Sequence, residues 1–174
     1  DAMMTLDFKQ DGDGIYLIGA SRDDLGSSEY LRSVCGVEFS PCPHFDLDEE
    51  CLVHEFVKKA IRHQWIQSAH DVSDGGLFTA LVESAMPNGL GFEVRSNSAV
   101  RKDAWLFGEA QSRVIVSARA EQIPDLERYL RAASLPFEQM GVVKASGLRV
   151  DGEDWGETKS WKRTYDTVLH KIMH

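Results

Sequence analysis

The stretch SAHDVSDGGLFTALVESAM, residues 68–86, decides the fold because its periodicity changes at the centre. Its first six residues read as a short strand, and the run from the glycine pair onward reads as a helix that Pro87 ends. Ser73 or Asp74 can cap this helix, and the glycines allow a tight turn into it. The same helix start can instead face a phosphate or a metal–phosphate. The local sequence favours the cap over the phosphate site.

Working outward from this stretch, strand-like and helix-like segments mix without a strict βα repeat. Strands are predicted at 14–21, 68–73, 90–96, 112–119, 136–146 and 148–154, and helices at 46–67, 75–86, 121–134 and 160–173. Within 24–36 a short helix is predicted after the polar start 26–28, and 100–111 is predicted as a short helix or a turn. The last two strands are predicted to pair around a turn at Ser146 and Gly147. This order favours an α+β layered domain over a doubly wound sheet. The length of 174 residues suits one domain, 1–174, with one buried core.

The composition, with 43% hydrophobic and 27% charged residues, is ordinary for a globular protein. The net charge of −9 argues against a nucleic-acid partner and against an anionic membrane partner. No run approaches the roughly 20 apolar residues of a membrane span, and no signal peptide opens the sequence. The opening residues 1–14 lead almost directly into a strand, so we expect a fragment of a larger chain.

Three polar clusters stand at strand ends or helix starts, and the first is Gly26-Ser27-Ser28 with Glu29. Its small residues can bring backbone N–H groups close to an anion, or they can simply cap a helix. The local sequence favours the cap here as well.

The second cluster carries two aspartates, Asp71 and Asp74, beside His70. The aspartates could hold Mg²⁺, which takes one or two carboxylates plus phosphate oxygens. His70 could be a general base, although a single histidine on a strand is more often a hydrogen-bonded structural residue. The residues of this cluster that could face a phosphate are Ser73, Gly75 and Gly76.

The third cluster places Gly108, Glu109, Gln111 and Arg113 before an apolar strand. Arg113 could grip a phosphate with its planar guanidinium, or it could pair with Glu109 as a structural ion pair. Elements that share a sheet tend to place such junctions at a common edge, where ligand clefts form. We therefore expect the three clusters to converge on one face.

Residues 13–31, 68–86 and 106–117 together resemble the second C-terminal half-domain of phosphoribosylformylglycinamidine synthase. The most specific parts are the H-D-x-S-D-G-G-L block and the G-E-x-Q-S-R block at this spacing, and the resemblance covers essentially the whole chain. It implies a three-layer α/β/α, α+β domain with a mixed sheet, partly ferredoxin-like, of the aminoimidazole ribonucleotide synthetase type.

The resemblance also implies an activity in the cytoplasm. The family joins formylglycinamide ribonucleotide and glutamine-derived ammonia at the expense of ATP, with Mg²⁺, to form the amidine of de novo purine biosynthesis. The implied partners are the N-terminal synthetase domains, which are missing from this chain, and the glutaminase. Because the family's catalytic histidine lies on those domains, no catalytic residue is expected here, and the isolated chain should be inactive. The implied ligand-binding residues are Gly26, Ser27, Ser28, Ser73, Gly75, Gly76, Glu109, Gln111 and Arg113 for nucleotide or phosphate, and Asp71 for magnesium.

One departure from the family pattern leaves alternatives open. In the first-copy domain a Glu-Ser-Gln contacts the ribonucleotide, whereas this chain has Ala110 in place of the serine. The cleft could therefore belong to a pseudo-symmetric nucleotide site in a non-catalytic domain that braces the protein or docks the glutaminase. Sister enzymes are a further alternative: aminoimidazole ribonucleotide synthetase, thiamine-phosphate kinase, selenophosphate synthetase and the hydrogenase-maturation dehydratase. The last uses a C-terminal cysteine, and this sequence has none after Cys51.

The cysteines Cys35, Cys42 and Cys51 should be reduced thiols without metal. Histidines follow two of them, but the spacing lacks the short C-x₂₋₄-C knuckle of structural zinc sites. Elemental analysis of the purified protein should therefore find no stoichiometric zinc, and a thiol assay should titrate all three cysteines. Bound zinc at one equivalent, or an internal disulfide, would contradict this.

Overall fold

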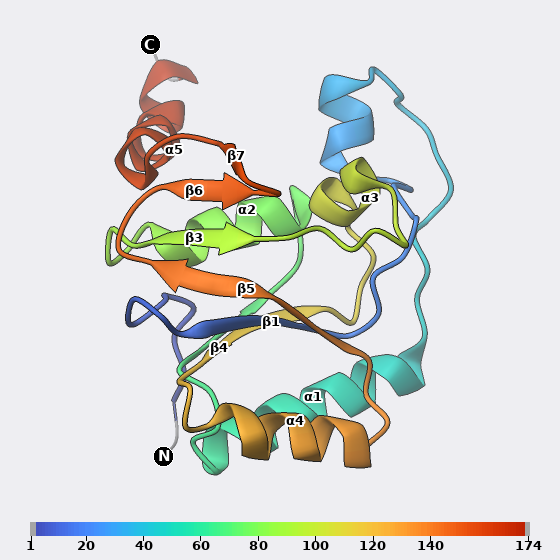
Figure 1. The fold of residues 1–174 in the computed structure, drawn as a ribbon. Helices are drawn as coiled ribbons and strands as arrows, with labels where there is room; N and C mark the ends of the chain where they lie inside the picture. Colours follow the sequence, from blue (N-terminus) through green and yellow to red (C-terminus); the bar gives the residue numbers. More distant parts are fainter. Residues whose placement is uncertain (1–2, 173–174) are drawn as a thin grey trace.

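The computed structural model describes residues 3–172, with side chains described through Val168. Within this part, seven strands form one sheet in the order β2-β4-β1-β5-β3-β6-β7 (Figure 1). β3 and β6 run parallel, and the other neighbouring pairs are antiparallel, so the sheet is mixed. The strands are β1 Gly14–Ile18, β2 Ser68–Asp71, β3 Gly91–Val94, β4 Val114–Ala118, β5 Phe137–Lys144, β6 Leu148–Val150 and β7 Glu153–Asp154.

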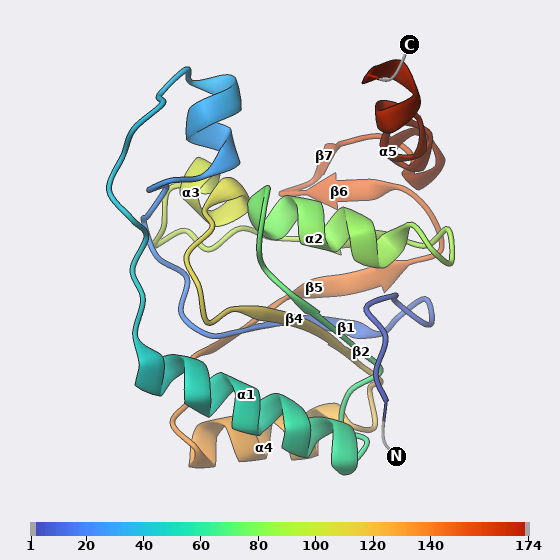
Figure 2. The same cartoon turned by 180° about the vertical axis from the view of Figure 1, so that it is seen from behind.

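Helices cover both faces of this sheet, which confirms the predicted three-layer α/β/α architecture. α1 and α4 lie on one face, while α2 and α3 lie on the other, with α5 beside β6 and β7 (Figures 1 and 2). A short π-helical segment, η1, occupies the place of the first predicted helix. The bounds are η1 Tyr30–Val34, α1 Leu47–Arg62, α2 Gly76–Ala85, α3 Lys102–Phe107, α4 Ile123–Ala132 and α5 Thr158–Ile172.

The burial of strand β1 explains why helices pack on both faces of the sheet. All five of its residues are buried, as expected for an apolar strand between two helical layers. Ile15 and Leu17 join the core under α2, whereas Tyr16 and Ile18 join the core under α1 and α4. The period-two alternation of a strand thus divides one short segment between two hydrophobic clusters.

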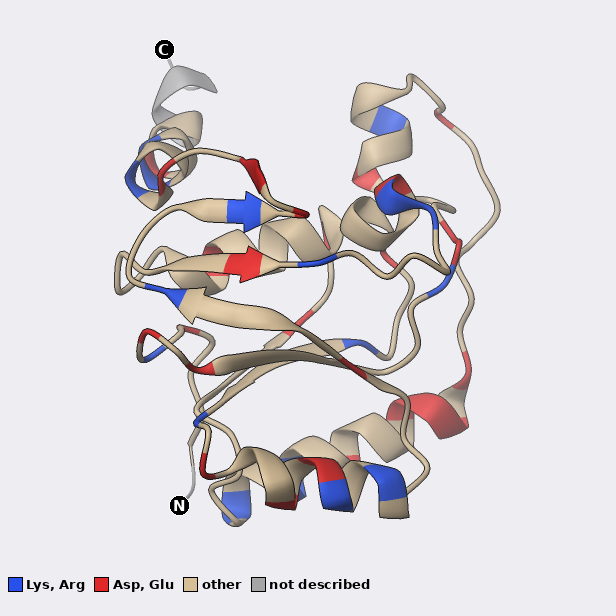
Figure 3. Cartoon of the chain, viewed as in Figure 1, with Lys and Arg blue, Asp and Glu red and all other residues tan. Residues whose placement is uncertain are grey.

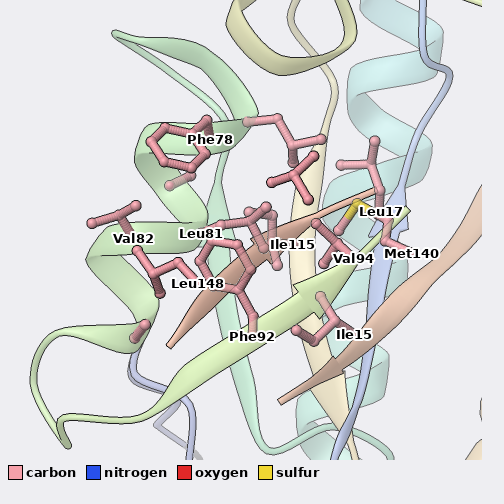
Figure 4. Close-up of a cluster of buried hydrophobic side chains, with 14 of the residues drawn as sticks. Ile15, Leu17, Phe78, Leu81, Val82, Phe92, Val94, Ile115, Met140 and Leu148 are labelled. Atoms are coloured by element: carbon pink, nitrogen blue, oxygen red, sulfur yellow. The ribbon is translucent and has the colours of Figure 1, made fainter. Parts of the chain in front are cut away.

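The core under α2 is the larger of the two clusters described. Leu77 and Leu81 are fully buried in the same cluster as Phe92 of β3 and Ile115 of β4. Figure 4 shows Leu81 beside Phe92 and Ile115. Burying a side chain of this size stabilises a fold by about 1.5–3 kcal/mol. α2 is therefore held tightly on the sheet, and its first residues have a fixed position.

α1 begins and ends at identifiable signals. The carboxylate of Asp46 accepts hydrogen bonds from the N–H groups of Asp48 (2.9 Å) and Glu49 (3.0 Å), so it is the N-cap. The acidic first turn, drawn red in Figure 3, suits the positive end of a helix. The helix ends at Arg62, earlier than predicted from the sequence, because Gln64 adopts a left-handed conformation with φ of 57°.

The predicted pairing of the two strands around Ser146 and Gly147 is wrong. Both strands exist, but β3 lies between them, pairing antiparallel with β5 and parallel with β6. The connection passes close over the start of β3, where a Cβ on Gly91 would lie 2.0 Å from the Gly147 carbonyl oxygen. Local turn residues look alike in a hairpin and in a connection that crosses an earlier strand, so the sequence signal was ambiguous.

The glycine pair at the start of α2 has a structural explanation. Gly75, with φ of 81°, is the N-cap residue, so the prediction that Ser73 or Asp74 caps the helix is wrong. Gly76 has φ of 72°, and a Cβ on it would lie 2.7 Å from the Phe107 Cα atom at the end of α3. The two glycines therefore allow both the left-handed turn and the close approach of α2 to α3.

We predict that Gly76→Ala destabilises the fold more than Gly89→Ala does. Both glycines have positive φ, at 72° and 63°, so both substitutions carry a backbone penalty of about 1 kcal/mol. At Gly89 a Cβ would meet nothing within 4 Å, whereas at Gly76 it would meet the backbone of α3. The crowding should cost Gly76→Ala about 1–3 kcal/mol more, measured by urea unfolding. Equal losses in the two variants would contradict the close-packing explanation.

Candidate functional site

Residues from all three polar clusters line one pocket of ≈ 360 Å³. It lies where β2 ends and β4 begins, with residues of α1 and of the loop before α1 along its other side. The predicted convergence of the clusters on one face is thereby confirmed. The lining residues are Ser27, Pro43, Glu50, His54, Asp71, Val72, Ser73, Asp74, Glu109, Gln111, Ser112, Arg113 and Val114.

Glu109 joins the three clusters directly. Its Oε1 atom accepts a hydrogen bond from the N–H of Glu29 at 2.8 Å and another from the N–H of Gly75 at 2.8 Å. These partners are 80 and 34 residues away along the chain. Hydrogen bonds to a charged acceptor contribute about 1.5–3 kcal/mol each. One carboxylate oxygen therefore fixes the starts of η1 and α2 relative to the loop before β4.

The first cluster satisfies most of its polar groups within its own loop. The N–H of Gly26 donates to the Asp24 carboxylate at 2.8 Å, and the N–H of Ser27 donates to the Ser40 hydroxyl at 2.7 Å. Ser28 is buried, and its hydroxyl donates to a backbone carbonyl three residues earlier. Of these three residues, Ser27 lines the pocket.

The second cluster presents its carboxylates to solvent. Asp71, at the end of β2, has a side chain that is 76% exposed, and Asp74 is exposed as well. Both line the pocket together with Ser73. His70 is turned away from it, because its Nε2 atom lies 2.9 Å from the Glu83 carboxylate of α2. The structural interpretation of His70 thus fits the geometry, while Asp71 and Asp74 remain accessible to a ligand.

Arg113 braces the third cluster from inside. It is only 3% exposed, and its Nε atom donates to the carbonyl of Ala110 at 3.0 Å while its Nη2 atom donates to the carbonyl of Gly108. Burial lowers the pKa of the guanidinium to about 10, which leaves it charged at neutral pH. These contacts hold the peptide on either side of Glu109. Gln111, by contrast, is exposed and faces the pocket.

Helix α1 forms one wall of the pocket, which was not predicted from the sequence. Ser112 donates its hydroxyl hydrogen to Glu50 Oε2 at 2.6 Å, and His54 Nε2 lies 2.8 Å from Glu50 Oε1. All three residues line the pocket. The four-residue spacing of Glu50 and His54 on a helix was a readable signal that they share a face. Their proximity to Ser112 was not readable, because it arises from packing across 62 residues.

The side chains that line the pocket can be compared with the ligands that a metal ion requires. Among the described residues, no group of three or more His, Cys, Asp and Glu side chains could hold a metal by itself. Mg²⁺ commonly takes only one or two carboxylates when phosphate oxygens and water supply the remaining ligands. Asp71 and Asp74 fit that role, in which the ion arrives with a nucleotide. The cysteines Cys35, Cys42 and Cys51 are exposed and free.

Within residues 3–172, no helix combines the length and the apolar character needed to cross a membrane.

We predict that Arg113→Lys destabilises the domain by about 3 kcal/mol at neutral pH, because a lysine cannot bond both carbonyls with a planar fork. The matched control is Arg128→Lys on α4, whose side chain is 76% exposed and pairs with Asp125. That change should stay within about 0.5 kcal/mol. Chemical unfolding of both variants measures the difference. An Arg113→Lys protein as stable as the parent would show that the guanidinium is not a brace.

Comparison with known proteins identifies relatives of the whole domain. Three relatives, each named phosphoribosylformylglycinamidine synthase subunit PurL, come from Symbiobacterium thermophilum, Alkaliphilus metalliredigens and Nitrobacter hamburgensis. They are 41%, 36% and 34% identical over 151, 146 and 170 residues, which is 84%, 84% and 97% of this chain. Those alignments cover 19%, 20% and 23% of the relatives. The chain therefore spans about a fifth of the length of these relatives.

Solved structures share the fold at low sequence identity. Thermotoga maritima PurL complexed with FGAR matches with a TM-score of 0.76 and 17% identity, covering 90% of this chain and 28% of that one. A thiamine-monophosphate kinase from Stenotrophomonas maltophilia matches with a TM-score of 0.53 and 21% identity, covering 86% and 53%. The family described as AIR synthase related protein, C-terminal domain, matches residues 10–152. This chain belongs to that family.

Proposed function

We propose that residues 1–174 form one domain of an ATP-dependent ligase that converts formylglycinamide ribonucleotide and ammonia to formylglycinamidine ribonucleotide. The observation that carries the proposal is that both family-specific blocks, one around Asp71 and one around Glu109, line the same pocket. The 34–41% identity to proteins named as this synthase supports the choice of reaction. The reaction would take place in the cytoplasm as a step of purine biosynthesis.

The charge of the pocket supports a metal–nucleotide complex over a free nucleotide as its ligand. Glu50, Asp71, Asp74 and Glu109 contribute carboxylates to the lining, whereas the guanidinium of Arg113 is buried and donates to backbone carbonyls. An unaccompanied triphosphate would be repelled by this excess of negative charge. Bound Mg²⁺ would offset the repulsion and stabilise the charge that develops on the phosphates during transfer.

In this proposal the chain orients and binds, and it supplies no catalytic base. Asp71 and Asp74 would hold the ion, while Ser27, Ser73 and Gln111 would offer hydrogen bonds to the nucleotide or the ribonucleotide. Gly75 and Gly76 would act through the backbone by setting the start of α2. The reacting groups would come from the part of the synthase that lies beyond this domain.

A second candidate is a structural nucleotide site in a non-catalytic half of the same protein. Two observations favour it over direct contact with the substrate. Ala110 is 2% exposed and carries no hydroxyl for a substrate, and the guanidinium of Arg113 binds backbone carbonyls. The bound nucleotide would then brace the domain and would not turn over.

The partners in this proposal are the N-terminal synthetase domains and the glutaminase. Large apolar side chains on the segment that leads into α1 are available for packing against them: Phe39 is 90% exposed, Phe45 54% and Leu47 63%. Single exposed apolar residues are common on protein surfaces, but several on one short segment are typical of an interface.

We predict that the isolated chain forms no amidine from ATP, formylglycinamide ribonucleotide and ammonia. Phosphoryl transfer needs cations positioned around the transferred group, and in this proposal most of them lie outside the domain. A coupled assay for ADP, with product detection by mass spectrometry, provides the measurement. ATP-dependent amidine formation above a heat-denatured control would contradict the proposal that the reacting groups lie outside this domain.

A chimera tests the proposed reaction itself. Replacing the matching domain of the Symbiobacterium thermophilum synthase with this chain should restore ammonia-dependent amidine formation, compared with the same protein lacking the domain. In the chimera, Asp71→Asn should lower kcat at least tenfold if the pocket holds the reacting nucleotide. Unchanged kcat with reduced nucleotide content would favour the structural site. A folded chimera without activity would contradict the proposed function.

A further inference from the structure

We infer that Glu109 is a positioning residue, an internal anion that holds the pocket together and does not itself contact the ligand. The inference rests on the proposed function for the identity of the ligand, but its structural part can be tested separately. The observation behind it is the pair of 2.8 Å hydrogen bonds from the N–H groups of Glu29 and Gly75 to one oxygen, Oε1 of Glu109.

The location of these amides explains why a carboxylate suits this position. Gly75 is the N-cap of α2, so its N–H lies at the positive end of a ten-residue helix. The N–H of Glu29 immediately precedes η1. A carboxylate at such a helix start is stabilised, and it uses a donor that would otherwise lack a partner. Glu109 thus supplies from within the chain the negative charge that this helix start favours.

The loop that carries Glu109 is itself immobilised from both sides. Arg113 donates to the carbonyls of Gly108 and Ala110, the two neighbours of Glu109. On the other side, a Cβ on Gly108 would lie 2.4 Å from the carbonyl oxygen of Ala104 and 2.5 Å from that of Asp24. The buried guanidinium and this close backbone approach hold the peptide on both sides of Glu109 in place.

The arrangement connects Glu109 to the residues that face the ligand. The carbonyl oxygen of Arg113 accepts the N–H of Val72 at 2.9 Å, which ties the segment after Asp71 to the same loop. Gln111 lies two residues beyond Glu109 and is exposed to the pocket. If Glu109 releases the two amides, the starts of η1 and α2 lose their common anchor, and the spacing between Ser27 and the loop that carries Gln111 is no longer fixed.

The inference makes opposite predictions for two substitutions. Glu109→Gln keeps an oxygen that can accept both N–H groups while it removes one negative charge from the pocket. Glu109→Ala removes the acceptor as well. A positioning role requires that Gln retain the arrangement and Ala lose it. A role as a metal ligand requires that both weaken ligand binding, because a neutral amide is a poor substitute for a carboxylate on Mg²⁺.

Residue-resolved amide hydrogen exchange on the 174-residue chain tests the structural part. Glu109→Ala should accelerate exchange at the N–H groups of Glu29 and Gly75 at least tenfold, whereas Glu109→Gln should stay within about threefold of the parent. The matched control is Glu55→Gln, an exposed carboxylate on α1 paired with Lys58, which should change neither amide. The N–H of Leu17 in β1 reports global unfolding, and in every variant it should remain far more protected than the amides of Glu29 and Gly75.

Three outcomes would overturn the inference: unchanged exchange at both amides in Glu109→Ala, acceleration at only one of them, or protection of both amides in Glu109→Ala as strong as that of Leu17. The chimera adds the functional part, where Glu109→Gln should leave KM for MgATP unchanged or lower, and Glu109→Ala should raise it at least tenfold. A raised KM in Glu109→Gln would instead assign Glu109 to the ligand. An inactive chimera with the expected exchange pattern would contradict the proposed function and leave the positioning role standing.

Discussion

One carboxylate oxygen, Oε1 of Glu109, accepts two backbone N–H groups from segments that are far apart in the sequence. The pocket depends on this interaction, since three of its walls come from the loop before η1, the segment between β2 and α2 and the loop before β4, while α1 forms the remaining side. Arg113 makes it possible by holding both neighbours of Glu109. The cost of burying that guanidinium is offset by its hydrogen bonds and by the carboxylates of Glu138, Asp24 and Glu109, which favour its charged form.

This arrangement separates framework residues from ligand-facing residues within the family motifs. Gly75 and Gly76 allow α2 to begin in a left-handed turn against α3, and Glu109 and Arg113 hold the loops. Asp71, Asp74, Ser73 and Gln111 remain exposed to the pocket. The first four residues therefore determine the shape of the site, and the other four determine what it can bind. The start of α2 is occupied by an anion of the chain itself, the carboxylate of Glu109.

The sequence predicted best what depends on local pattern. The buried strand β1 was readable from its apolar run, and the helices α2 and α4 were readable from the sequence pattern between their flanking turn residues. Contacts between distant segments could not be predicted from the sequence. The position of β3 between β5 and β6, the hydrogen bond between Ser112 and Glu50, and the inward direction of Arg113 all arise from packing across many residues. The convergence of the three clusters was predicted because strand ends share an edge, but the atom that joins them was not.

The most direct test of this account follows the two amides when the acceptor oxygen of Glu109 is removed. In ¹⁵N-labelled samples of the chain, the amide proton resonances of Glu29 and Gly75 should both shift upfield in Glu109→Ala, because both N–H groups lose the same acceptor. Both resonances should stay close to their parent positions in Glu109→Gln, which keeps an acceptor oxygen. Unchanged resonances in Glu109→Ala, or a shift of only one of the two, would show that separate groups hold the two segments and would contradict the account.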